Sequence, residues 1–107
     1  MIELVYYRDE NGRSHFIEWL AALRDKLAKT RIAARLRQIE SGNLGDSKPV
    51  GEGVLELRIH IGAGYRVYCG RYGLNWVILL CGGDKDSQTK DITRAKMLWT
   101  EWKRRQP

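Results

Sequence analysis

The sequence predicts a single α+β domain in which two N-terminal helices pack on an antiparallel sheet, with the element order β-α-α-β-β-β-α. Two observations predict this arrangement. Apolar residues recur at helical spacing between residues 16 and 39, and they alternate with polar residues from residue 54 onward. A chain of 107 residues has room for one domain, so we expect residues 1–107 to form one unit.

The first half of the chain predicts one strand and two helices. Residues 2–7 form a short apolar run of strand-forming residues, and turn-forming residues 9–12 close it. Ser14 is a candidate cap for a helix whose apolar residues are Phe16, Leu20, Leu23 and Leu27. A second helix is expected from about Thr30, with Gly42 just past its end. Residues 42–53 have the composition of a loop.

The second half predicts three strands and a last helix. The first of these strands buries alternate residues, namely Leu55, Leu57, Ile59 and Ile61. Residues 65–71 alternate in the same way, and residues 76–81 are apolar almost throughout. Their short connections predict an antiparallel meander. Ser87 or Thr89 caps the last helix, whose apolar residues are Ile92, Ala95, Trp99 and Trp102.

Charge indicates an anionic partner. The chain carries a net charge of +6, and residues 54–107 contribute ten basic against five acidic side chains. Such a balance favours nucleic acid first, an acidic protein second and a membrane surface third. Cys69 and Cys81 lie in apolar strands and are expected to be structural. No apolar run has the length of a membrane span, so we expect a cytoplasmic protein.

The phase of the strands predicts a basic surface. If the leucine and isoleucine side chains of residues 55–61 face the helices, the polar side chains between them face the other way. The expected open sheet face then carries Arg58, His60, Arg66 and Tyr68, with Lys85 and Lys90 arriving from the following loop. Such a surface suits a phosphodiester and stacked bases. The alternative is an ordinary solvated sheet face.

Other patterns are weaker. Arg31 and Arg35 lie on the expected exposed face of the second helix, where they are either solvated or in contact with a nucleic-acid backbone. Residues 82–85 lack the spacing of a phosphate-binding loop. The carboxylates of residues 84–91 have no further ligand at metal-binding spacing, so we expect neither a metal nor a cofactor.

Three segments together resemble a known family: GVLELRI at 53–59, GYRVY at 64–68 and ILLCGGDK at 78–85. The chain resembles the HigB-type addiction-module killer proteins, also called the phage Gp49-like family, within the RelE/ParE toxin superfamily. The likeness runs nearly end to end. It implies a RelE-like fold and a toxin that cleaves mRNA in the ribosomal A site. It also implies neutralisation by a HigA-like antitoxin with a helix-turn-helix domain.

The resemblance further implies a reaction without a metal, in which a ribose 2′-hydroxyl attacks the adjacent phosphate. Arg66 matches the central sheet arginine of the family, and Lys85 matches the basic residue after the last meander strand. Arg58 is a further candidate for stabilising charge at the phosphate. The general base is open among His60, Tyr68 and Lys85, since this chain has no second histidine on the expected face.

Two other functions fit the same sequence. One is a ParE-like toxin that inhibits DNA gyrase by binding it, without catalysis. The other is a basic nucleic-acid-binding domain that is not toxic.

Overall fold

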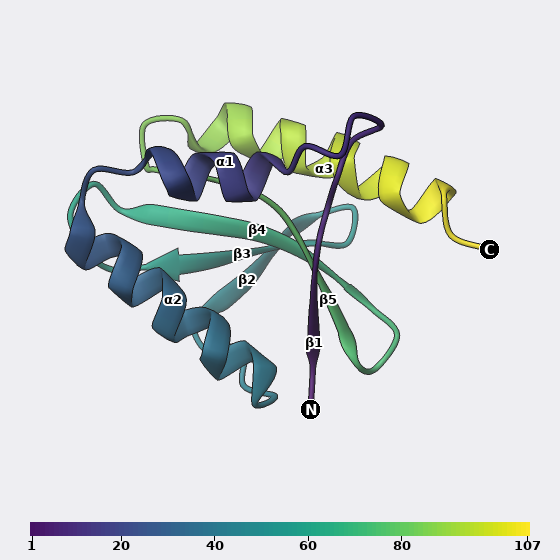
Figure 1. The fold of residues 1–107 in the computed structure, drawn as a ribbon, viewed down its shortest axis with the longest axis horizontal. Coiled ribbons are helices and arrows are strands. Elements are labelled where there is room, and N and C mark those ends of the chain that lie inside the picture. The colour runs from purple at the N-terminus through teal and green to yellow at the C-terminus, as the bar shows by residue number, and fades with distance from the viewer.

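Five strands form one mixed sheet, and helices cover both of its faces (Figure 1). The computed structural model describes residues 1–107. Its elements follow in this order: β1 (Glu3–Tyr6), α1 (His15–Ala22), α2 (Lys26–Glu40), β2 (Ser47–Gly51), β3 (Val54–Ile59), β4 (Tyr65–Tyr72), β5 (Trp76–Gly83) and α3 (Gln88–Arg104). The spatial order of the strands is β1-β5-β4-β3-β2, in which β1 is parallel to β5 and all other neighbours are antiparallel.

This architecture corrects the fold predicted from the sequence. The element order is β-α-α-β-β-β-β-α and the sheet is mixed, so the predicted antiparallel, RelE-like arrangement is wrong. Residues 42–53 are not a loop throughout, because they contain β2, whose Lys48 lies opposite Glu56 of β3. Lys48, Pro49 and Gly51 give β2 the composition of a turn. A lysine and a proline are nevertheless common on a strand at the edge of a sheet.

The boundary between the first two helices also differs from the prediction. α1 ends at Ala22, and α2 begins at Lys26 rather than near Thr30. Asp25 caps α2, because its carboxylate accepts a hydrogen bond from the backbone N–H of Ala28 at 3.0 Å. Leu27 therefore belongs to α2, where it is 55% exposed. Its spacing from the apolar residues of α1 was coincidental.

Two separate cores lie on the two faces of the sheet. α1 and α2 pack on one face with residues such as Leu57, Val67 and Leu79. α3 packs on the other face, where Tyr68 and Ile78 are buried beneath it. The alternation predicted for the strands is thus confirmed, but the face expected to be open is covered by α3 over much of its length. Only the end of this face near the start of α3 is left for a site.

The remaining features of the fold are the character of its helices and the state of its two cysteines. None of the three helices is long and apolar enough to cross a bilayer. Cys69 and Cys81 are free and buried, and burial raises the pKa of both thiols to about 12. Both cysteines therefore act as small apolar residues of the core, and neither is an activated nucleophile.

Gly70 tests the packing of α3 on the sheet. A Cβ at this position would lie 2.5 Å from the indole of Trp99. We expect Gly70→Ala to lower the free energy of unfolding by about 2 kcal/mol, because the indole must move. Urea denaturation measures the change. In the control, Gly73→Asn, a Cβ meets no atom within 4 Å and a φ of +66° suits asparagine, so the free energy of unfolding should be unchanged. Equal stability of the two variants would contradict the packing.

Candidate functional site

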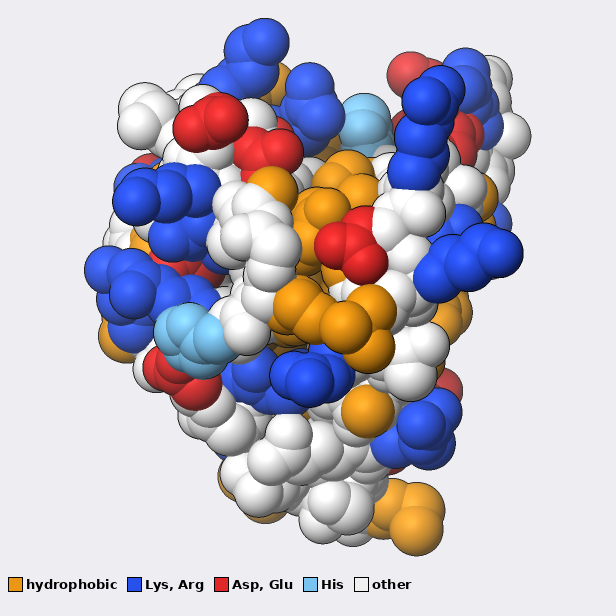
Figure 2. All heavy atoms as spheres, turned by 90° about the vertical axis from the view of Figure 1, so that its left-hand side faces the viewer, with side chains coloured by type: hydrophobic (Ala, Val, Ile, Leu, Met, Phe, Trp, Pro, Cys, Tyr) orange, Lys and Arg blue, Asp and Glu red, His pale blue; other side chains and the backbone are white.

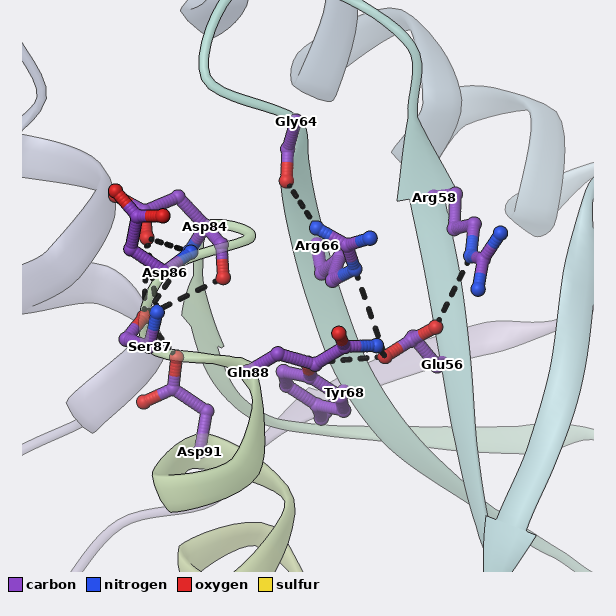
Figure 3. A network of polar contacts seen from close by, with 10 residues as sticks. All are labelled: Glu56, Arg58, Gly64, Arg66, Tyr68, Asp84, Asp86, Ser87, Gln88 and Asp91. Atoms are coloured by element: carbon purple, nitrogen blue, oxygen red, sulfur yellow. Dashed lines mark hydrogen bonds and ion pairs between the residues drawn. The ribbon is translucent and has the colours of Figure 1, made fainter.

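Four polar side chains form a group where β3 ends and β4 begins (Figure 3). Alternation places Glu56 and Arg58 of β3 on the α3 face, and it places Arg66 and Tyr68 of β4 on the same face. The strand register pairs Glu56 with Tyr68 and Arg58 with Arg66. Two arginines therefore lie directly opposite each other, beside one carboxylate.

The Glu56 carboxylate is the centre of this group. The side chain is fully buried, and its oxygens accept hydrogen bonds from Gln88 Nε2 (2.8 Å), Arg58 Nε (3.1 Å) and the Tyr68 hydroxyl (3.1 Å). Arg66 Nε lies 3.7 Å from the same carboxylate. Burial acts to raise the pKa of Glu56, but the three donors and the Arg66 charge outweigh it, so the pKa falls below its ordinary value. The carboxylate is thus ionised at neutral pH and holds both guanidinium groups in place.

Arg66 lines a small hollow beside Glu56. The residue is 9% exposed, and its Nη1 donates to the Gly64 carbonyl at 2.6 Å. Its Nε is buried without a hydrogen-bond partner. This buried Nε is directed at the Glu56 carboxylate, with which it forms an ion pair rather than a hydrogen bond. The hollow has a volume of about 80 Å³ and is lined by Arg58, Ile59, His60, Gly64, Tyr65 and Arg66.

Tyr68 lies below this hollow rather than on an open face. Its ring is fully buried under α3, and its hydroxyl donates to Glu56. Burial and the negative charge of Glu56 raise the pKa of Tyr68 above its ordinary value. The phenol therefore keeps its proton at neutral pH, and its place in the structure is that of a donor to Glu56.

Lys85 and His60 flank the hollow. The backbone N–H of Lys85 donates to the Ala63 carbonyl at 3.3 Å, which ties the β5–α3 loop to the β3–β4 turn. A Cβ added to Gly64 would contact both Lys85 Cβ (3.5 Å) and Arg66 Nη1 (3.4 Å), so these two residues are neighbours. The His60 side chain is 70% exposed, and its Nε2 contacts the Asp46 carboxylate. This contact is the main cause that lowers the pKa of Asp46.

The three sequence-predicted binding residues outside this group are placed differently from one another. Arg35 donates to the carbonyls of Leu44, Asp46 and Arg58, so its guanidinium is engaged within the protein. Arg31 is exposed and lines a second hollow together with Arg58 and His60. Lys90 is exposed in the first turn of α3 and lines neither hollow. Figure 2 shows this end of the molecule, where Lys and Arg side chains gather beside a strip of apolar side chains.

Sequence reasoning missed Glu56, Gln88 and Asp46. The signal for Glu56 was present, because the alternation that places Arg58 on the α3 face places Glu56 there too. Gln88 reaches Glu56 across 32 residues of sequence, and no local pattern could have found that contact. No group of three or more His, Cys, Asp or Glu side chains is arranged to hold a metal ion.

Comparison with known proteins gives a relative without an assigned activity. No protein-family model matches the sequence. An uncharacterized protein of Haemophilus influenzae is 50% identical over 86 residues, which is 80% of this chain and 87% of that protein. The chain belongs to the family of this Haemophilus protein. The family does not identify a reaction, so the site itself must indicate the function.

Glu56→Gln removes the central charge and keeps the side-chain shape. We expect it to lower the free energy of unfolding at pH 7 by about 3 kcal/mol, because two arginines lose a buried counter-charge. Folding lowers the pKa of Glu56, so its contribution is complete above the unfolded pKa and is lost as the pH falls through the folded pKa. The difference between wild type and variant should therefore shrink from pH 5 to pH 2.

Urea denaturation at pH 7 and between pH 5 and pH 2 measures this difference. Glu10→Gln is the control, because Glu10 is exposed in the turn after β1. A loss for Glu56→Gln that is as large at pH 2 as at pH 7 would show that the charge of Glu56 is not what stabilises the group.

Proposed function

We propose that the protein is the toxin of a type II toxin–antitoxin system and that it cleaves mRNA on the ribosome. The observation that carries this proposal is the pair Arg58 and Arg66, held side by side by Glu56 at the wall of a hollow. Like charges directly opposite each other on neighbouring strands oppose folding. An arrangement that costs stability is typical of a functional site. Two adjacent guanidinium groups match the oxygens of one phosphodiester.

The sequence motifs support the same proposal. Arg58 lies in the segment GVLELRI and Arg66 in the segment GYRVY, two of the three segments that resemble HigB-type toxins. Lys85 ends the third segment, and it neighbours Arg66 in space. The residues that carry the resemblance therefore gather at one end of the sheet.

The proposed reaction is a transesterification within the RNA strand. The ribose 2′-oxygen attacks the neighbouring phosphorus while the bond from phosphorus to the 5′-oxygen breaks. The products carry a 2′,3′-cyclic phosphate and a 5′-hydroxyl. The 2′-hydroxyl proton passes to a base, and the leaving 5′-oxygen takes up a proton. Arg66 and Arg58 stabilise the extra negative charge that develops on the phosphorane oxygens.

His60 is the proposed base. An imidazole exchanges protons near neutral pH, and His60 lines the same hollow as Arg66. The Asp46 carboxylate contacts one ring nitrogen and leaves the other for the substrate. Lys85 adds a third positive charge beside Gly64, and its ammonium group gives the proton that the leaving 5′-oxygen takes up. Tyr68 has no part in the proton transfer, because its hydroxyl is committed to Glu56.

The partners of the proposal follow from charge and from the resemblance. The ribosome presents the mRNA, and a HigA-like antitoxin covers the basic end of the sheet with an acidic segment. Both encounters take place in the cytoplasm. The net charge of +6 favours each of these partners.

Arg66→Gln tests the phosphate contact. Induced wild-type protein should stop growth and leave mRNA fragments with 5′-hydroxyl ends on ribosomes. Arg66→Gln should not stop growth and should slow cleavage at least about a hundredfold, because one stabilising donor is lost. Arg71→Gln is the control on the same strand, since Arg71 is exposed at the far end of β4. Urea midpoints of both variants separate catalysis from folding.

Three results would contradict the proposal. Growth arrest with intact mRNA and relaxed plasmid DNA would indicate gyrase inhibition. Harmless expression of the folded wild-type protein would indicate a nucleic-acid-binding domain without toxicity. Cleavage by Arg66→Gln at the wild-type rate would remove this site from the reaction.

A second pair of variants tests the roles of His60 and Tyr68. Tyr68→Phe removes one donor to Glu56, so it should lower the free energy of unfolding by about 1 kcal/mol and leave cleavage within about threefold of wild type. His60→Gln should keep stability and slow cleavage about a hundredfold, because a general base is lost. Single-turnover cleavage on programmed ribosomes measures both. If Tyr68→Phe cleaved more slowly than His60→Gln, the proton transfer would belong to Tyr68 instead.

A further inference from the structure

A second hollow adjoins the one at Arg66. It has a volume of about 290 Å³ and extends from the end of β3 to α2. Arg58, Ile59 and His60 line both hollows. Because three residues are common to their walls, the two hollows lie side by side; together they are called the β3–α2 groove.

One face of α2 forms the far wall of the β3–α2 groove. The lining residues of this helix recur at helical spacing: Arg31, Ala34, Arg35 and Gln38. Ala34 has a short side chain and leaves the groove open. Each of the two hollows has its own arginine in addition to the shared Arg58, with Arg31 in the hollow at α2 and Arg66 in the other. The acid at its rim, Asp46, is in contact with His60.

The two arginines of this wall differ in what they can bind. Arg35 donates to three backbone carbonyls of the α2–β2 loop and of β3, so it builds the wall. Arg31 is exposed and takes part in none of the ion pairs of the protein. Arg31 is therefore the free cation at the α2 end of the groove.

We propose that Arg31 binds a second phosphodiester of the RNA strand, so that the strand runs along the β3–α2 groove from the cleaved phosphate at Arg66. This inference rests on the proposed function and adds the path of the substrate. The occupant is single-stranded RNA, because a hollow of about 290 Å³ is too small for a duplex, and the unstacked bases of a single strand are free to enter it. A path along α3 would pass Lys90, which lines neither hollow.

Binding of an uncleavable RNA tests the path. The probe is a fluorescein-labelled octauridylate with 2′-O-methyl groups, which cannot attack the phosphate. Its affinity is measured by anisotropy between 25 and 200 mM KCl. A contact to single-stranded nucleic acid contributes about 0.7 to the slope of log K against log salt, so Arg31→Gln should reduce the slope by about 0.7 and the affinity about fivefold. Arg37→Gln is the matched control, because Arg37 is exposed on α2 outside the groove wall.

A second substitution blocks the groove without removing a cation. Ala34→Glu adds one methylene group and a carboxylate to the side chain in the groove, and both alanine and glutamate have high helix propensity. It should weaken binding of the octauridylate about tenfold, because a like charge meets the phosphates. Ala21→Glu, at an exposed position of α1, should leave binding unchanged. Urea midpoints confirm that all variants are folded.

The outcomes separate this inference from the proposed function. Three results would each contradict binding of RNA in the groove. They are equal salt slopes for Arg31→Gln and Arg37→Gln, a reduced slope for Lys90→Gln alone, and no binding of the octauridylate by wild type. Any of these together with 5′-hydroxyl mRNA fragments on ribosomes would leave the proposed function standing. Binding that depends on Arg31 in a protein that leaves mRNA intact would support the groove and remove the proposed function.

Discussion

The buried Glu56 carboxylate is the interaction on which the site depends. It allows Arg58 and Arg66 to lie opposite each other, and its bond to Gln88 joins the first residue of α3 to the sheet. One carboxylate compensates one of the two arginines, so the group retains one positive charge. A phosphodiester carries one negative charge and completes the balance. In the proposed reaction, Lys85, which the β5–α3 loop holds beside Arg66, then acts at the leaving 5′-oxygen.

The start of α3 covers some residues of the site and leaves others exposed. Glu56 and Tyr68 are fully buried under the start of the helix, and Arg66 lies at its margin with 9% of its surface exposed. His60 lies beyond the helix and is largely exposed. This gradient places fixed polar groups below the substrate in the proposed reaction, and it places the exposed His60 beside it. Charges are preorganised before the substrate arrives, which is the arrangement that stabilises a transition state.

Strand alternation could be read from the sequence, and it assigned Arg58, Arg66 and Tyr68 to one face correctly. What covers that face could not be read, because an amphipathic helix shows which of its own residues are buried and not what they contact. Tyr68 was therefore predicted to be open and Glu56 was passed over. β2 was missed for a related reason, since Lys48 and Pro49 form a strand only because the edge of β3 offers them hydrogen bonds.

Arg31 and Arg35 show why composition alone cannot assign function to a basic helix. The two are the same residue type, four positions apart on one face of α2. Arg35 meets carbonyls of the α2–β2 loop, and its Nη1 donates to the Arg58 carbonyl at 2.6 Å. Arg58 is thus fixed by Arg35 at its backbone and by Glu56 at its side chain. A substitution of Arg35 would disturb both the groove wall and the arginine pair, whereas Arg31 reports on the groove alone.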